Sequence, residues 1–338
     1  MKNIIAFVTG ILFVLLFTTC TKERLNDLSV ASGKKAAAGS TQYTVTTLAG
    51  AFVPSEDEHD GVGRGASFFE PNGIAVAQNG DLYVADINGN SIRRIVKDSV
   101  VSTVQFPTSG VGNQVPFAPF EIAVSTDGYI TFTQNGDFRS APSVISYKPN
   151  TDIYKERSSP DGSAFSSVSL DPHFNLVWVC SSQVFTNSYQ IYKVDPPKQQ
   201  LYPKLVAIDN VGQDVSFVAI SACLNNIKYL ATSKNTLYKF TSDQQLVLIP
   251  NIHFDSIMGM AATKDASTIY VADDGYIKRI DVATGTMTTI AGPDGSNTQK
   301  DGVGMAADVS AIRVALSNDE KTLYFTNYGF IIRKITLM

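Results

Sequence analysis

Hydrophobic residues in this chain occur in short runs that polar turns interrupt, and the stretch 71–95 shows this pattern most clearly. Apolar, β-forming runs at 74–77 and 82–85 flank a Gln-Asn-Gly-Asp sequence, whose Asn-Gly pair readily adopts the positive φ angles of a hairpin turn. Two further β-forming runs, at 91–96 and 100–105, follow after polar turns. The pattern therefore predicts a four-stranded antiparallel meander.

The same pattern recurs along the chain. When the second strand of each unit is taken as its anchor, successive anchors lie 40 to 54 residues apart. The anchors are Leu82, Ile130, Val177, Tyr229, Ile269 and Leu323. Six units of this length favour radial repetition over a sandwich. We therefore predict an all-β fold, a six-bladed β-propeller of four-stranded antiparallel blades that spans 43–338.

The two ends of the repeat region complement each other. The sixth unit ends at Met338 after its third strand, so its outermost strand is missing at the C-terminus. The segment 44–50 (TVTTLAG) resembles 287–292 (MTTIAG), which is the predicted fourth strand of the fifth unit. We expect 44–50 to pair with the last blade and close the ring, because this pairing leaves no open sheet edge there.

Several motifs resemble NHL repeats, most closely in units one, five and six. They are TLAG (47–50), DGVGRGASF (60–68), PNGIAV (71–76), LYVADINGNSIRRI (82–95), TIAG (289–292), DGVGMAADV (301–309) and IIRKI (331–335). The resemblance implies the propeller fold. It leaves the activity open, because this family includes protein-binding, RNA-binding and lyase members on one scaffold.

Two repeated features favour a structural role over a ligand site. The DGVG stretches at 60–63 and 301–304 do not open a helix, so we interpret them as tight links between blades, where glycine tolerates unusual φ angles. Paired basic residues recur at one strand position, which indicates a role in the repeat itself. They are Arg93-Arg94, Lys278-Arg279 and Arg333-Lys334.

The N-terminal residues 1–20 have the pattern of an export signal. A lysine precedes an apolar segment at 4–17, which is short for a membrane-spanning helix and typical of a signal peptide. The segment resembles a bacterial lipoprotein signal, which implies that Cys20 is lipidated and becomes the mature N-terminus. Phe17 and Thr19 depart from the residues most common in that signal. A secretory signal cut elsewhere and an uncleaved anchor are the alternatives.

Residues 21–42 are small and polar with no apolar period, which predicts a flexible tether. The expected location is therefore the envelope of a bacterium, with the chain lipid-anchored at the outer membrane or cell surface and the propeller extracytoplasmic.

The net charge of −4 and the lack of a basic run argue against nucleic-acid binding. We expect a monomer. Cys180 and Cys223 fall at opposite ends of neighbouring strands, which predicts two buried free thiols.

Candidate binding residues lie at the ends of the second strands, which should all point to one mouth of the ring. They are Asp86, Gln134, Ser181, Ser233, Asp273 and Asn327. Asn72 and Glu121, which enter inner strands, and His253, in a connection between blades, should reach the same rim. These side chains either cap turns through bonds to the backbone or line a polar pocket. In the second case Asp86 and Asp273 are candidate ligands for Ca²⁺, which takes oxygen ligands.

Zinc or nucleophilic catalysis finds little support in the sequence. The three histidines lie far apart in the repeat pattern, with His173 on a turn facing away from the mouth and His59 and His253 in connections between blades. A zinc site needs several such ligands together. No Gly-x-Ser-x-Gly or HExxH motif is present. We assign no catalytic residue.

The sequence favours a membrane-tethered binding propeller whose mouth recognises a protein, peptide or glycan partner. The alternative is an enzyme, a Ca²⁺-assisted lyase or lactonase that resembles the amidating-lyase and gluconolactonase-like propellers. In that case oxygen ligands from at least three blades should converge on one point in the channel.

Overall fold

The computed structural model divides the chain into two compact units, Met1–Ser40 and Thr41–Met338, and its described residues all belong to the second. The described residues are 43–51, 58–97, 99–107, 116–135, 141–151, 153–159, 162–182, 190–198, 201–205, 215–241 and 246–337. The predicted signal peptide, Cys20 and the tether lie outside them. Within the described ranges no helix is both long and apolar enough to cross a membrane.

Six antiparallel sheets form the blades, as the sequence predicted. Blade one consists, from the inside outward, of β3 (Pro71–Val76), β4 (Leu82–Asp86), β5 (Ser91–Val96) and β6 (Val100–Thr103). Blade two follows with β7 (Pro119–Val124), β8 (Ile130–Gln134), β9 (Ser143–Tyr147) and β10 (Tyr154–Ser158). Blade three has β11 (Ala164–Asp171), β12 (Leu176–Ser182), β13 (Gln190–Val194) and β14 (Leu201–Leu205).

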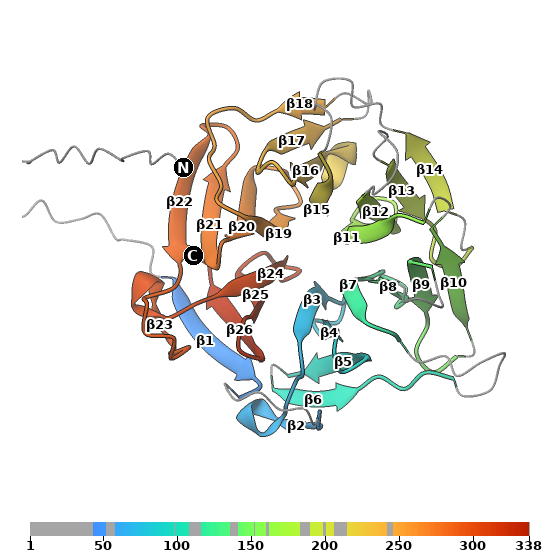
Figure 1. The fold of residues 1–338 in the computed structure, drawn as a ribbon, viewed down its shortest axis with the longest axis horizontal. Coiled ribbons are helices and arrows are strands. Elements are labelled where there is room, and N and C mark those ends of the chain that lie inside the picture. Colours follow the sequence, from blue (N-terminus) through green and yellow to red (C-terminus); the bar gives the residue numbers. More distant parts are fainter. Residues whose placement is uncertain are drawn as a thin grey trace, which may run out of the picture. The chain divides into compact units, whose positions relative to one another are not determined.

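The remaining blades repeat this order. Blade four has β15 (Phe217–Ala222), β16 (Lys228–Thr232), β17 (Leu237–Phe240) and β18 (Leu246–Leu248). Blade five has β19 (Ile257–Ala262), β20 (Thr268–Asp273), β21 (Tyr276–Asp281) and β22 (Thr286–Ala291). Blade six has β24 (Ala311–Leu316), β25 (Thr322–Asn327), β26 (Ile331–Thr336) and β1 (Thr44–Ala49). Figure 1 shows the six inner strands around a common axis.

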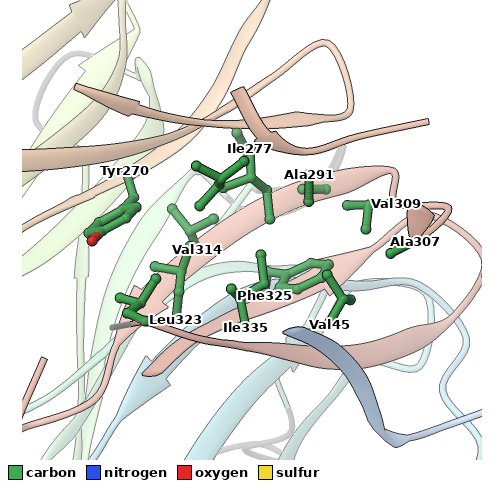
Figure 2. Close-up of a cluster of buried hydrophobic side chains, with 14 residues drawn as sticks. Val45, Tyr270, Ile277, Ala291, Ala307, Val309, Val314, Leu323, Phe325 and Ile335 are labelled. Carbon is green, nitrogen blue, oxygen red and sulfur yellow. The ribbon is translucent and has the colours of Figure 1, made fainter. Parts of the chain in front are cut away.

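The N-terminal strand closes the ring as predicted. Strand β1 pairs antiparallel with β26, with Val45 opposite Ile335 and Thr47 opposite Arg333. The side chain of Val45 is fully buried between blades five and six, in a cluster that includes Ile277 and Phe325. Figure 2 shows this cluster. The closing strand thus contributes to the hydrophobic packing between blades as well as to the sheet.

The DGVG stretches do more than link blades. They place a fifth short strand on the outer edge of two blades: β2 (Gly61–Val62) pairs with β6, and β23 (Gly302–Val303) pairs with β1. The sequence predicted only the links. The next residues, Gly63 and Gly304, have φ angles of 56° and 55°, which glycine tolerates.

A buried arginine fixes each DGVG segment. The guanidinium of Arg93 is fully buried and donates to the Ser67 carbonyl at 2.7 Å and to Asp60 Oδ1 at 3.0 Å. Asp60 also accepts a hydrogen bond from Thr103 on β6. Blade six repeats the arrangement with Arg333, Asp301 and Thr47. Arg93 and Arg333, which begin two of the three basic pairs, therefore have a structural role, as the repeat pattern indicated. In blade six this arrangement also includes Thr47 on β1, the strand from the N-terminus.

Cys180 and Cys223 are free and buried, as expected. Burial raises the pKa of Cys223 to about 12 and raises the pKa of Cys180 as well. Because the thiolate is the reactive form, both thiols should be inert near neutral pH.

Candidate functional site

The six inner strands run in the same direction along the axis. We call the end at which they begin the entry face; their first residues are Pro71, Pro119, Ala164, Phe217, Ile257 and Ala311. We call the end at which they stop the turn face; their last residues are Val76, Val124, Asp171, Ala222, Ala262 and Leu316. The predicted mouth corresponds to the entry face.

Five of the six predicted strand-end residues occupy equivalent register positions. Each lies opposite a residue at the start of its inner strand: Asp86, Gln134, Ser181, Asp273 and Asn327. In blade four the equivalent residue is Thr232, which lies opposite Phe217, so the assignment of Ser233 was one residue too late. The run that begins at Tyr229 aligns with Tyr83 in blade one, and not with Leu82, because β16 begins one residue earlier, at Lys228.

These side chains cap the loops that lead into the inner strands. Asp86 accepts backbone N–H bonds from Phe69 at 2.9 Å and Glu70 at 2.5 Å. Asp273 accepts from the amides of residues 255 and 256, and Asn327 accepts from Ser310 N at 2.9 Å. Asp86, Asp273 and Asn327 are fully buried. Their role is the loop-capping one, and they set the shape of the entry face from beneath.

The remaining predicted residues also bond within the scaffold. Gln134 Oε1 accepts a long hydrogen bond from Phe117 N at 3.3 Å, and Ser233 Oγ accepts one from Ser216 N at 3.0 Å. Asn72 is buried and donates to the Phe120 carbonyl at 2.7 Å, which links blades one and two. Ser181 is also buried.

The arrangement of Asp86 and Asp273 does not fit a Ca²⁺ site. They belong to blades one and five, and the oxygens of Asp273 are engaged by backbone amides and by the ammonium group of Lys278. Throughout the described part of the chain, no three His, Cys, Asp or Glu residues gather where they could hold a metal ion. Ca²⁺ takes six or more oxygen ligands around one point. Two carboxylates in separate blades, already bonded to neighbouring groups, do not supply such a set.

Asp86 has an unusual protonation equilibrium. Its burial, together with the neighbouring carboxyl of Glu58, raises the pKa of Asp86 to about 7. Glu58 itself accepts a hydrogen bond from Ser91 Oγ at 2.7 Å and lies 3.5 Å from the Arg93 guanidinium. The Asp86 cap therefore changes charge near neutral pH.

An ion pair closes the centre of the entry face. Arg313 on β24 donates through Nε to the carboxylate of Glu121 on β7, and both side chains are almost fully buried. The two strands belong to blades six and two, so the pair passes the inner strand of blade one. Burial raises the pKa of Glu121, and the charge of Arg313 opposes this shift. The sequence identified Glu121 as a rim residue but missed its partner.

Two glycines make room for this ion pair. A Cβ added to Gly73 would lie 2.8 Å from the Glu121 Cα, and one added to Gly259 would lie 2.8 Å from the Arg313 Cδ. Both glycines sit at the register position that Glu121 and Arg313 occupy in their own blades. The inner ring is therefore built from small residues beside large charged ones.

Beneath the ion pair lies a central channel of about 190 Å³. Its first ring of walls is aliphatic: Ile74, Ile122, Val168, Ile220, Met260 and Val314. The next ring is small: Ala75, Ala123, Ser169, Ser221, Ala261 and Ala315. The first ring is buried, whereas Ala262 and Leu316 near the turn face are partly exposed. The hollow of the propeller thus lies toward the turn face, which differs from the polar pocket expected at the entry face.

The entry face carries aromatic and aliphatic side chains. Phe120 lies under the guanidinium of Arg313, whose Cζ is 5.2 Å from the ring centroid. Among the described residues of the entry-face loops and strands, three large apolar side chains are exposed: Phe117 by 43%, Met258 by 38% and Tyr328 by 70%. In the described part of the chain, the entry face therefore presents exposed apolar groups, and a buried arginine lies at its centre.

The three histidines lie in three separate places in the propeller and do not form a cluster on the entry face. His59 Nδ1 lies 2.7 Å from Ser67 Oγ, near the DGVG segment of blade one. His173 lies in the turn between β11 and β12 on the turn face, against the ring of Phe174. His253 lines a separate hollow of about 340 Å³ with Lys234 and other residues of blade four. The predicted rim position of His253 therefore corresponds to a different pocket.

The fold and register define a six-bladed β-propeller whose first blade contains an NHL repeat. Residues 68–93 match the model of the NHL repeat family, which confirms the resemblance for that unit. This match covers β3, β4 and the start of β5. Among curated proteins, no sequence matches this chain.

Solved structures share the fold at low sequence identity. A protein of unknown function from Bacteroides thetaiotaomicron is 17% identical with a TM-score of 0.67, over 88% of this chain and 76% of that one. An auxiliary nutrient binding protein from the same organism is 15% identical with a TM-score of 0.62, over the same shares. Virginiamycin B lyase from Staphylococcus aureus is 16% identical with a TM-score of 0.56, over 88% and 100%. These likenesses establish the fold alone.

Proposed function

We propose that this chain is a membrane-tethered, extracytoplasmic binding propeller that recognises a protein, peptide or glycan partner through the entry face. The observation that carries the proposal is the set of exposed apolar side chains on the entry face, Phe117, Met258 and Tyr328, together with the contact of Arg313 with Phe120. Aromatic residues, methionine and arginine are the types enriched in interface cores. The auxiliary nutrient binding protein with the same fold is consistent with such a role.

The enzyme alternative has weaker support. A Ca²⁺-assisted lyase or lactonase would need oxygen ligands from several blades around one point. Asp86 and Asp273 instead bond to the backbone of their own blades, and the centre of the entry face contains the Glu121–Arg313 pair. A binding surface accounts for these residues better than a metal centre does.

The proposed tether rests on the sequence of the N-terminal region. Strand β1 begins at Thr44, so the small, polar residues 21–42 would separate a lipidated Cys20 from the propeller. A flexible segment of this length would allow the entry face to turn toward a partner.

Binding through the entry face can be tested with the full chain in detergent on peptide and glycan arrays. Met258→Asp places a charge on the entry face, and Phe174→Asp makes the matched change at a residue on the turn face that is 50% exposed. We expect array binding by the wild type and by Phe174→Asp, and at least a tenfold loss in Met258→Asp. Absence of wild-type binding, or equal binding by both variants, would contradict the proposal.

A further inference from the structure

A pocket of about 280 Å³ lies on the entry face at the junction of blades six and one. We call it the junction pocket. It is lined by Phe69, Glu70, Pro71, Asn88, Ile312, Asn327, Tyr328, Gly329 and Phe330. Three of these residues are aromatic and come from two loops that are far apart in the sequence. The ring closure through β1 and β26 brings these loops into one place.

Buried capping residues hold both walls of the junction pocket. Asp86 accepts the backbone N–H bonds of Phe69 and Glu70, which fixes the first wall. Asn327 bonds to Ser310 N and to the carbonyl of Tyr328, which fixes the second. The walls are therefore preorganised, which lowers the entropy lost when a ligand binds.

The turn that carries the second wall has an unusual backbone. Phe330 has a φ of 67°, which is rare for a bulky residue. Its carbonyl lies so close to Gly50 that a Cβ there would be 2.3 Å away. Residues held in such conformations cluster at ligand-binding sites, and here the strained turn presents two aromatic residues to the pocket.

The only acidic side chain of the junction pocket among the described residues is Glu70. It is exposed and accepts a hydrogen bond from Asn88 Nδ2, which orients the carboxylate. Among the described residues, no lysine, arginine or histidine forms a salt bridge with the Glu70 carboxylate, with a nitrogen–oxygen distance of 4.0 Å as the limit. An oriented carboxylate beside three aromatic rings is complementary to a positive charge, because ring faces and carboxylates both attract cations.

We propose that the junction pocket binds the side chain of a lysine or arginine that a peptide or protein partner presents. The aliphatic stem lies against Pro71, Ile312 and the rings, and the charged end meets Glu70. The volume is slightly below the range typical of ligand pockets, which favours one side chain over a larger molecule. This inference rests on the proposed function and selects a peptide or protein over a glycan.

The test uses saturation-transfer NMR on the full chain in deuterated detergent. The probes are the Nα-acetyl N-methylamides of lysine, arginine and norleucine, and methyl β-glucoside. Norleucine keeps an apolar stem without the charge, and the glucoside tests a neutral sugar. Glu70→Gln removes the charge of the pocket, and Tyr328→Ala removes a ring that is 70% exposed. Glu156→Gln and Phe174→Ala are the matched controls, because Glu156 is another exposed carboxylate bonded to an amide.

We expect saturable binding of the lysine and arginine probes. The Kd should rise about fivefold or more in Glu70→Gln and in Tyr328→Ala, and stay unchanged in both controls. Norleucine should bind more weakly than lysine and should not respond to Glu70→Gln. Thermal unfolding midpoints close to that of the wild type would show that the pocket variants are folded.

Three results would overturn the inference. They are a lysine Kd unchanged by Glu70→Gln, norleucine binding as tight as lysine binding, and a preference for the glucoside that Tyr328→Ala removes. Array binding that Met258→Asp abolishes and Glu70→Gln leaves unchanged would retain the entry face as the binding surface and reject only the junction pocket. Array binding insensitive to Met258→Asp would reject the proposed function itself.

Discussion

Arg313 on the inner strand of blade six forms an ion pair with Glu121 on the inner strand of blade two, past the inner strand of blade one. The pair therefore joins two blades that are not sequence neighbours, and one of them, blade six, is the blade that β1 completes. The guanidinium of Arg313 lies over the ring of Phe120, so the pair has two roles: it braces the inner ring and forms the centre of the proposed binding surface.

Removing one member of this pair should destabilise the fold strongly. Arg313→Met leaves Glu121 buried without a partner, so we expect the free energy of unfolding to fall by roughly 3 kcal/mol. The double variant Arg313→Met/Glu121→Leu replaces both charges with apolar groups and should recover most of the loss. Urea unfolding followed by circular dichroism measures these differences.

The control for that experiment is the pair of Arg94 and Asp81 in blade one, in which the arginine is exposed. Arg94 is 43% exposed in its side chain, so Arg94→Met should lower the free energy of unfolding by less than about 1 kcal/mol. An equal loss in Arg94→Met and Arg313→Met would contradict the special role of the central pair.

Both glycines beside the ion pair should tolerate substitution poorly. Gly73→Ala places a methyl group against backbone atoms of blade two, which cannot rotate away, and we expect a loss of about 1–3 kcal/mol. Gly259→Ala meets the Cδ of Arg313, a side chain that the buried ion pair holds in place, and should destabilise by a similar amount. Gly65, which has open space around it and an ordinary φ, provides the control. Thermal unfolding of the three variants checks this order; equal midpoints for Gly73→Ala and Gly65→Ala would refute it.

The blade order and the ring closure could be predicted because they depend on features that each unit repeats. Apolar runs separated by turn residues specify strands locally, and the similarity of 44–50 to 287–292 identified the closing strand. The strand β2 could not be predicted in the same way. It contains only Gly61 and Val62, too few residues for a period, and its pairing depends on the buried contact of Arg93 with Asp60.

The candidate site was predicted less well, because the position of a residue along its strand does not reveal which group its side chain bonds to. Asp86 and Asp273 were placed at the correct strand ends, and their oxygens accept hydrogen bonds from the backbone of their own blades, which is the capping alternative. The sequence alone left both this role and a polar pocket open. The pairing of Glu121 with Arg313 had a signal in the sequence: opposite charges occupy one register position in two apolar inner strands. Glu121 and Arg313 are 192 residues apart in the sequence. This signal can therefore be recognised only once the inner strands of blades two and six are aligned in register.

The lipid anchor can be tested apart from the propeller. If Cys20 is lipidated, the wild type expressed in a bacterium should incorporate a labelled fatty acid and partition into detergent. Cys20→Ser should lose the label and remain in the aqueous phase, whereas Cys180→Ala should keep it, because Cys180 is buried in the propeller. A Cys20→Ser variant that still partitions with membranes would support an uncleaved anchor instead.

The stability of the protein should depend on pH through Asp86. Its carboxyl has a pKa of about 7 in the folded chain against an ordinary value of 3.8, because burial and Glu58 disfavour the charged form. Between these values the folded state holds a proton that the unfolded chain has released. The free energy of unfolding should therefore fall as the pH rises through this window, and the stabilisation is fully present only below about pH 4.

Glu58→Gln should flatten this dependence. Without the second carboxyl, the pKa of Asp86 moves closer to its ordinary value, so less stability is lost between pH 5 and pH 8, by on the order of 1 kcal/mol. The variant also loses contacts to Ser91 and Arg93, so the informative quantity is the slope with pH and not the stability at one pH. Urea unfolding at several pH values measures the slope. A slope as steep in Glu58→Gln as in the wild type would show that Glu58 does not control Asp86, and the pH dependence would then arise from burial alone.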